Sequence, residues 1–138
     1  MKLSPRITLR IAIVGSWICL GLAVAVSFWE EQRLPPSLFE YLQAQYSANV
    51  SPVEMLVGLL LFVALVVASV GLLALARWSR PLFLFSTLAG LFLWPVVGPN
   101  VEGPWEALFH ELSLLGFGFV IALSYFGEAK KHFVRRAA

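Results

Sequence analysis

Aspartate is absent from this chain of 138 residues, and cysteine occurs once, as Cys19. A single cysteine excludes an internal disulfide, a CxxC redox pair and a cysteine-rich metal site. Charged residues make up only 13% of the sequence, whereas hydrophobic residues make up 59%. A water-soluble core of this size could not hide so many apolar side chains, so lipid must be the solvent for much of the surface. The composition therefore predicts an integral membrane protein.

Four apolar runs are separated by short polar stretches. Crossing a hydrocarbon layer of about 30 Å takes roughly 20 helical residues at about 1.5 Å per residue. We expect four spans, of which the third is short and carries Pro95 in its last turn, at about 7–28, 52–76, 81–97 and 105–126. Because nearly all the connections are short, the sequence predicts an all-α fold: an integral membrane four-helix antiparallel bundle that forms a single membrane domain, 1–138.

Residues 30–50 form the one polar stretch of any length. After Pro35 and Pro36, the run Ser37–Glu40 has the S-x-x-E form of a capping box. Leu38, Tyr41, Leu42 and Tyr46 follow at helical spacing. This outer segment is predicted to be a short amphipathic interfacial helix between helices 1 and 2, on the membrane surface or over the mouth of the bundle. A second capping box, Ser51–Glu54, opens the second span.

Basic residues are distributed unevenly between the two ends of the spans. Arg33 lies at one end, and the other end carries the remaining nine: Lys2, Arg6, Arg10, Arg77, Arg80, Lys130, Lys131, Arg135 and Arg136. The positive-inside rule then predicts cytoplasmic N- and C-termini, with a basic cytoplasmic tail at 128–138. The compact loops favour a bacterial inner membrane. Bases placed beside spans act as topology determinants, so we expect no nucleic acid partner.

The first apolar run has a competing interpretation as a signal peptide. It has a basic start, and the small residues Ala23-Val24-Ala25 resemble a cleavage site. The run is long for a signal peptide, however, and it ends in the aromatic residue Trp29. A retained membrane span is therefore the favoured interpretation.

Small residues recur at helical spacing in three of the spans. In a bilayer such residues mark faces at which helices can pack closely. The pairs or ridges are Gly21 with Ala25, Ala64 with Ala68 and Gly71, and Gly118 with Ala122. The sequence leaves open whether these faces make internal contacts or contact another chain.

The fourth span carries the few ionisable residues of the predicted membrane region, Glu106, His110 and Glu111. Glu111 shares a face with Gly118 and Ala122, so we expect it to point into the bundle. A charge at that depth is costly unless it is paired, neutral or hydrated, which makes it a candidate functional site. One interpretation is an ion, proton or partner site formed by Glu111, His110, Glu106 and Arg33. The structural alternative is a Glu111 that is neutral or hydrogen-bonded to Arg33 or a tyrosine.

His110-Glu111 matches the start of the zinc motif H-E-x-x-H, but Leu114 occupies the second histidine position. A divalent site would need Glu30 or Glu31 as further ligands, so we expect no metal and no cofactor. Known catalytic motifs are also missing, and we expect the protein not to be an enzyme.

Two functional classes remain, with a membrane-embedded enzyme as a distant third. The first is a non-catalytic accessory, assembly or helix-contact subunit, whose partners are the lipid bilayer and a membrane protein or a second copy of the chain. The second is an oligomeric small transporter or channel that uses the Glu/His site, since four helices alone enclose little space.

Overall fold

The computed structural model describes residues 4–49, 51–93 and 102–133. Within these ranges the chain forms five α-helices and one short 3-10 helix, with no strand. The elements are α1 (Pro5–Glu31), α2 (Pro36–Asn49), α3 (Pro52–Leu73), α4 (Ser79–Leu93), α5 (Pro104–Tyr125) and η2 (Glu128–His132). The all-α prediction is confirmed.

Three of the helices, α1, α3 and α5, are long and apolar enough to cross a membrane. This finding supports a membrane protein. The third predicted span, 81–97, corresponds to α4, which begins earlier and has 15 residues. At about 1.5 Å per residue it covers roughly 22 Å, less than the ~30 Å of a hydrocarbon layer. Residues 94–97 of the predicted span lie outside the described residues.

Local capping explains where several helices begin. The capping box at the start of α3 is confirmed, with the Ser51 N–H donating to Glu54 Oε2 (2.7 Å) and the Glu54 N–H donating to Ser51 Oγ (3.3 Å). The box predicted at Ser37–Glu40 is wrong. Helix α2 already begins at Pro36, and the carbonyl of Pro35 accepts the first hydrogen bonds, so Ser37 lies inside the helix.

Helix α3 ends three residues before the predicted boundary at residue 76. Leu75 follows the helix with a φ of 58°. Its N–H donates to the carbonyl of Leu72, and the N–H of Ala76 donates to the carbonyl of Gly71. This pair of hydrogen bonds is a Schellman motif, in which the left-handed residue is usually glycine. A leucine at this position gives no turn signal in the sequence.

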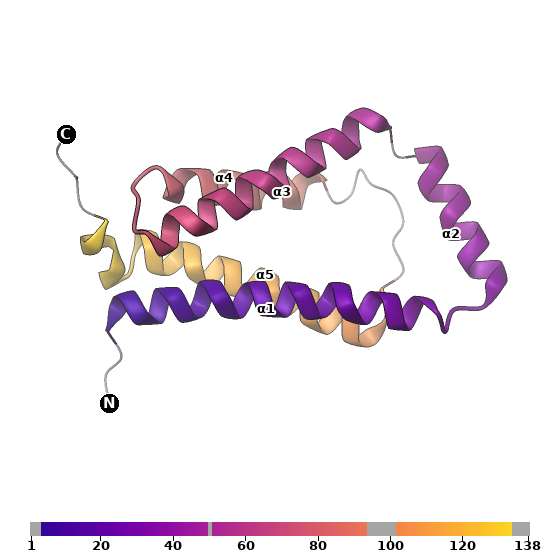
Figure 1. The fold of residues 1–138 in the computed structure, drawn as a ribbon, viewed down its shortest axis with the longest axis horizontal. Coiled ribbons are helices and arrows are strands. Elements are labelled where there is room, and N and C mark those ends of the chain that lie inside the picture. The colour runs from indigo at the N-terminus through magenta and orange to yellow at the C-terminus, as the bar shows by residue number, and fades with distance from the viewer. Residues whose placement is uncertain (1–3, 50, 94–101, 134–138) are drawn as a thin grey trace.

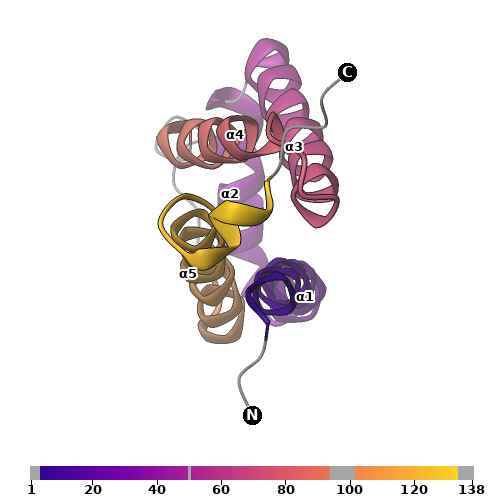
Figure 2. The ribbon, with the colours of Figure 1, turned by 90° about the vertical axis from the view of Figure 1, so that its left-hand side faces the viewer.

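The helices are arranged as two antiparallel pairs, α1 with α5 and α3 with α4 (Figure 1). The pairs lie close together at the end of the molecule that holds the first and last described residues, and they diverge towards α2 (Figures 1 and 2). Contacts between α1 and α3 are few, so the four-helix antiparallel bundle expected from the sequence is not confirmed. Trp17 makes one of these contacts, because its Nε1–H donates to Ser69 Oγ at 3.0 Å.

The apolar core lies where the two pairs meet. Every element except α2 contributes, and Phe117 of α5 is in edge-to-face contact with Trp17 and with Phe83. The buried members are Leu9, Ile13, Ala68, Leu72, Phe83, Phe117, Val120, Ala129 and Phe133.

The start of the segment predicted as a basic tail folds back on the bundle. Helix η2 contacts both α1 and α5, and Ala129 and Phe133 are buried in the core. The N–H at Nε of Arg77 donates to the carbonyl of Phe133 at 3.0 Å, and the guanidinium of Arg80 lies over the Phe133 ring. Residues 134–138 lie outside the described residues.

Candidate functional site

The start of α5 is built against the end of α1. The N-cap residue of α5 is Gly103, which offers no side-chain hydrogen bond to the free N–H groups of the first turn. The carboxylate of Glu30 takes this role, accepting from the N–H of Trp105 (3.3 Å) and from the N–H of Glu106 (3.2 Å). A negative charge at a helix N-terminus is favoured by the helix dipole. A Cβ on Gly103 would overlap the Glu30 carboxylate, so a larger residue there would displace this side chain from the helix start.

Three carboxylates and one imidazole gather around this helix start. The Nδ1 atom of His110 lies 3.3 Å from Glu102 Oε1, and both side chains are about one-fifth exposed (22% and 20%). Glu106 interacts electrostatically with Glu102, Glu30 and His110. We call these four residues, Glu30, Glu102, Glu106 and His110, the acidic cluster. It places three acidic side chains and one histidine at one end of the α1–α5 pair.

Two of the four residues of the acidic cluster, Glu106 and His110, were predicted from the sequence as candidate site residues. Glu102 was not predicted, and Glu30 was considered only as a possible metal ligand. Glu102 lies eight residues before His110, outside the helix, so no helical spacing relates them. Glu30 is separated from Glu106 by 76 positions. The signal that was available is the pair of acids flanking the helix-starting Gly103-Pro104.

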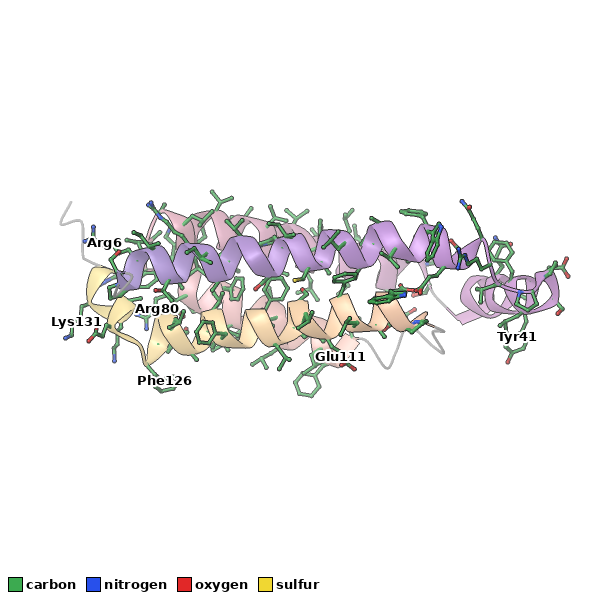
Figure 3. The ribbon with its side chains drawn as sticks, turned by 90° about the horizontal axis from the view of Figure 1, so that it is seen from below. Arg6, Tyr41, Arg80, Glu111, Phe126 and Lys131 are labelled. Atoms are coloured by element: carbon green, nitrogen blue, oxygen red, sulfur yellow. The ribbon has the colours of Figure 1, made fainter. Side chains whose placement is uncertain are left out.

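The expectation that Glu111 points into the bundle is wrong. The buried side chains of α5 are Ser113, Phe117, Val120 and Ser124, whereas Glu111 is exposed. In Figure 3 it lies on the side of α5 away from α1. The prediction assumed that Gly118 and Ala122 face inwards, but both are exposed, and a Cβ on Gly118 would meet no atom within 4 Å.

Helix α5 contacts α1 at Gly116, which lies on a different face of α5 from Gly118 and Ala122. A Cβ on Gly116 would overlap Ser16 Oγ of α1. The small residues predicted to mark helix contacts therefore fall into two groups, one exposed and one buried in the structure. Gly21, Ala25, Gly118 and Ala122 are exposed, while Ala68 and Gly71 of α3 are buried, the latter against Trp78 and Ser79.

Arg33 is not brought to Glu111. Its guanidinium carbon lies 3.6 Å from the centroid of the Trp29 ring, a cation–π contact at the end of α1. Of the four candidate site residues, the structure brings Glu106 and His110 together and leaves Glu111 and Arg33 apart from each other. Within the described ranges, no group of three histidine, cysteine or acidic side chains is arranged to hold a metal ion.

The opposite end of the molecule carries six of the nine clustered bases. We call Arg6, Arg10, Arg77, Arg80, Lys130 and Lys131 the basic end. Some of them stabilise the fold: Arg10 Nη2 donates to the carbonyl of Leu73 at 3.3 Å, and Arg80 lies over the Tyr125 ring. Lys130 and Lys131 are exposed.

Comparison with known proteins identifies no relative. No family model matches the chain, and no curated protein or solved structure is significantly similar to it.

Proposed function

We propose that this protein is a non-catalytic accessory or assembly subunit that acts by contacting another membrane protein through its helices. The observation that carries this proposal is the composition of the interior. Every buried polar side chain within the described residues is a serine. A pathway for an ion or a polar substrate needs ionisable or hydrated groups between the helices.

Three of these six serines donate to a carbonyl of their own helix. Ser16 donates to the carbonyl of Ala12, Ser69 to that of Leu65 and Ser124 to that of Ile121. Ser113 Oγ is buried with no hydrogen-bond partner. Such hydroxyls permit close helix packing but offer little to a moving ion, so function is assigned to the surface.

The surface of α5 supplies a specific candidate. Glu111, Leu115, Gly118 and Ala122 share one face at spacings of four, three and four residues, and all four are exposed. We call them the α5 stripe. Small residues let a second helix approach closely, and a partner that covers Glu111 can pair a carboxylate that lipid would leave uncompensated. The stripe is the surface we assign to the partner.

We further propose a bacterial inner membrane location with both termini in the cytoplasm. The support is that the first and last described residues lie at one end of the molecule, together with the basic end (Figure 1). Cytoplasmic loops of membrane proteins carry an excess of Lys and Arg. Reporter fusions at each terminus test this arrangement: both should report the cytoplasm, and a periplasmic signal from either would contradict it.

Affinity purification of the tagged full chain in a mild detergent tests the subunit proposal. We expect one stoichiometric membrane protein partner with the wild type and at least a fivefold loss of it with Gly118→Leu. Gly58→Leu is the matched control, because a Cβ at either glycine meets no atom within 4 Å. A wild type that purifies with neither a partner nor a second copy, or equal recovery with the two variants, would contradict the proposal.

A second candidate is an oligomeric transporter or channel that uses Glu111, His110, Glu106 and Arg33. The exposure of Glu111 on an apolar helix favours it, because in an oligomer this carboxylate could line a path between copies. Purified protein in vesicles would then show ion or proton flux that Glu111→Gln abolishes while the protein still inserts. Under the subunit proposal, the wild type gives no flux above that of empty vesicles.

A further inference from the structure

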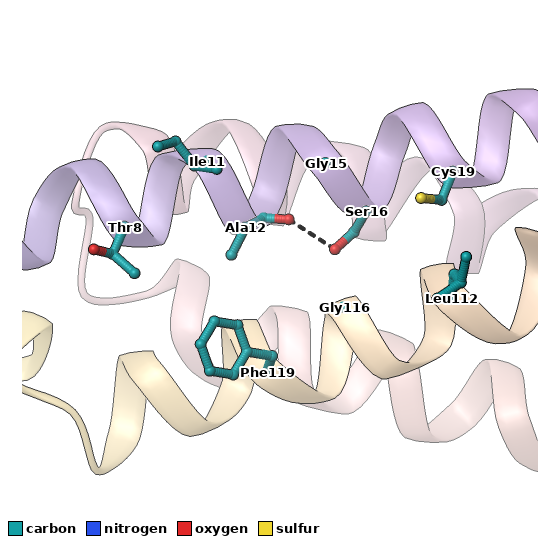
Figure 4. Close-up of a pocket in the computed structure, with 9 residues that line it drawn as sticks. All are labelled: Thr8, Ile11, Ala12, Gly15, Ser16, Cys19, Leu112, Gly116 and Phe119. Atoms are coloured by element: carbon teal, nitrogen blue, oxygen red, sulfur yellow. Dashed lines mark hydrogen bonds between the residues drawn. The ribbon is translucent and has the colours of Figure 1, made fainter. Parts of the chain in front are cut away.

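An open groove of about 300 Å³ runs along the outside of the α1–α5 pair (Figure 4). Its floor is made by the small residues of the helix contact, and its walls by larger apolar side chains. It is lined by Thr8, Ile11, Ala12, Gly15, Ser16, Cys19, Leu112, Gly116 and Phe119.

The lining offers almost nothing to a polar ligand. The Ser16 hydroxyl donates to the carbonyl of Ala12 at 2.7 Å, as Figure 4 shows, and the Thr8 hydroxyl donates to the carbonyl of Ser4 at 3.3 Å. The remaining polar group is the thiol of Cys19, a weak donor. Because the hydroxyls are engaged within α1, the groove suits a hydrocarbon occupant.

The length of the groove selects among hydrocarbon occupants. From Thr8 to Cys19 it follows α1 for about 16 Å at the helical rise, roughly half the ~30 Å of a hydrocarbon layer. That is the depth of one leaflet and hence of one acyl chain. A partner helix that crosses the membrane would contact a surface about twice as long.

Charge at one end of the groove selects the headgroup. The Thr8–Phe119 end of the groove faces the basic end, and η2 packs there on α1 and α5. Figure 3 places Arg6 and Lys131 at this end of the molecule. Arg6, Lys130 and Lys131 are exposed there, and Glu128 is the single acid at this end within the described residues. Basic residues beside a groove between membrane helices recognise phosphate headgroups.

We propose that the groove binds an anionic phospholipid of the leaflet at the basic end. One acyl chain lies between α1 and α5, and the headgroup phosphate is held by Arg6, Lys130 and Lys131. This lipid site uses a different face of α5 from the α5 stripe, so it does not depend on the proposed protein partner.

The test titrates the purified full-length protein, in detergent, with phosphatidylglycerol or with phosphatidylcholine of the same acyl chains, and follows thermal unfolding. We expect the wild type to bind phosphatidylglycerol at least tenfold more tightly. Gly15→Leu places a larger apolar side chain in the groove, where its Cβ meets no atom within 4 Å, and should weaken binding at least tenfold. Gly21→Leu, on the same helix and equally open but outside the groove, is the matched control and should bind as the wild type does.

A second variant separates the headgroup from the chain. Lys130→Gln with Lys131→Gln changes two exposed side chains and should remove most of the preference for phosphatidylglycerol while leaving weak binding of phosphatidylcholine. Equal affinity for the two lipids in the wild type would overturn the proposal, as would equal binding by Gly15→Leu and Gly21→Leu. Equal stabilisation by inorganic phosphate alone would overturn the acyl-chain part.

Cys19, the one cysteine of the chain, can show whether a helix of a second copy occupies the groove instead of a lipid. If the groove holds a helix of a second copy, mild oxidation in membranes should link Cys19 to Cys19 of that copy as a disulfide dimer. A dimer that forms equally with and without added phosphatidylglycerol would overturn the proposal. We expect no dimer, and slower maleimide labelling of Cys19 when phosphatidylglycerol is bound.

Discussion

The carboxylate of Glu30, the last residue but one of α1, accepts a hydrogen bond from the backbone N–H of Glu106, 3.2 Å away in the first turn of α5. An acid on one helix thereby caps the start of another that is distant in the sequence. The contact ties the first turn of α5 to the end of α1. It thereby helps to position α5 against α1, and with it the groove and the α5 stripe.

Replacing Glu30 with alanine removes this cap. Loss of an N-cap side chain typically costs about 1 kcal/mol and up to ~2 kcal/mol, so we expect the free energy of unfolding to fall by about that amount. Unfolding in mixed micelles, titrated with a denaturing detergent and followed by circular dichroism, measures it. Glu31→Ala, an exposed neighbour, is the control. Equal stability of the two variants would show that the cap contributes nothing.

Gly103→Ala should act through the same contact. The new Cβ would occupy the space of the Glu30 carboxylate and displace it from the helix start. We expect a loss of roughly 1–2 kcal/mol in the same unfolding assay. Residues that share one contact give non-additive effects, so the Glu30→Ala, Gly103→Ala double variant should lose clearly less than the sum. Additive losses would mean that the two positions act independently.

Two glycines of α5, only two positions apart, should respond in opposite ways to the same substitution. Gly116→Ala puts a Cβ into Ser16 of α1 and should cost about 1–3 kcal/mol by overpacking. Gly118→Ala meets open space and should leave stability equal or raise it by up to about 1 kcal/mol, because alanine is the better helix former. Equal responses, measured by the same detergent titration, would contradict the packing of α5 on α1.

The C-terminal segment should contribute to stability despite its basic composition. Phe133 is buried, and Phe133→Ala should lower the free energy of unfolding by about 3 kcal/mol, the lower end of the usual range for such a truncation. Lys131→Ala, exposed on the adjacent η2, should change it by less than about 0.5 kcal/mol. Similar small effects at both positions would mean that residues 128–133 do not anchor the bundle.

Composition and local signals were enough to predict the helical elements. Hydropathy located the apolar helices, and the Ser51–Glu54 capping box set the start of α3. Local signals failed where the backbone departs from the usual residue preference, as at Leu75, whose positive φ ends α3 without a glycine.

The face that each helix buries could not be predicted from its own sequence. Gly116 and Gly118 both sit among apolar residues, but two helical positions point in nearly opposite directions, so the rotation of α5 about its own axis decides which of them meets Ser16. That rotation depends on contacts with residues distant in the sequence, which no local pattern encodes. Glu106 and His110, four positions apart on α5, do lie together, whereas the inward orientation expected for Glu111 is wrong. A functional site at the start of α5 stays a prediction.

The most direct test of the proposed function is photo-crosslinking in intact cells, with a photoreactive amino acid placed at position 118 or at position 58. Both glycines are open in the structure, so the probe should leave the fold unchanged. We predict a discrete crosslinked band, to a membrane protein partner or a second copy, from position 118 and not from position 58. No protein adduct at position 118, or the same adducts from both positions, would contradict the assignment of the α5 stripe as the partner surface.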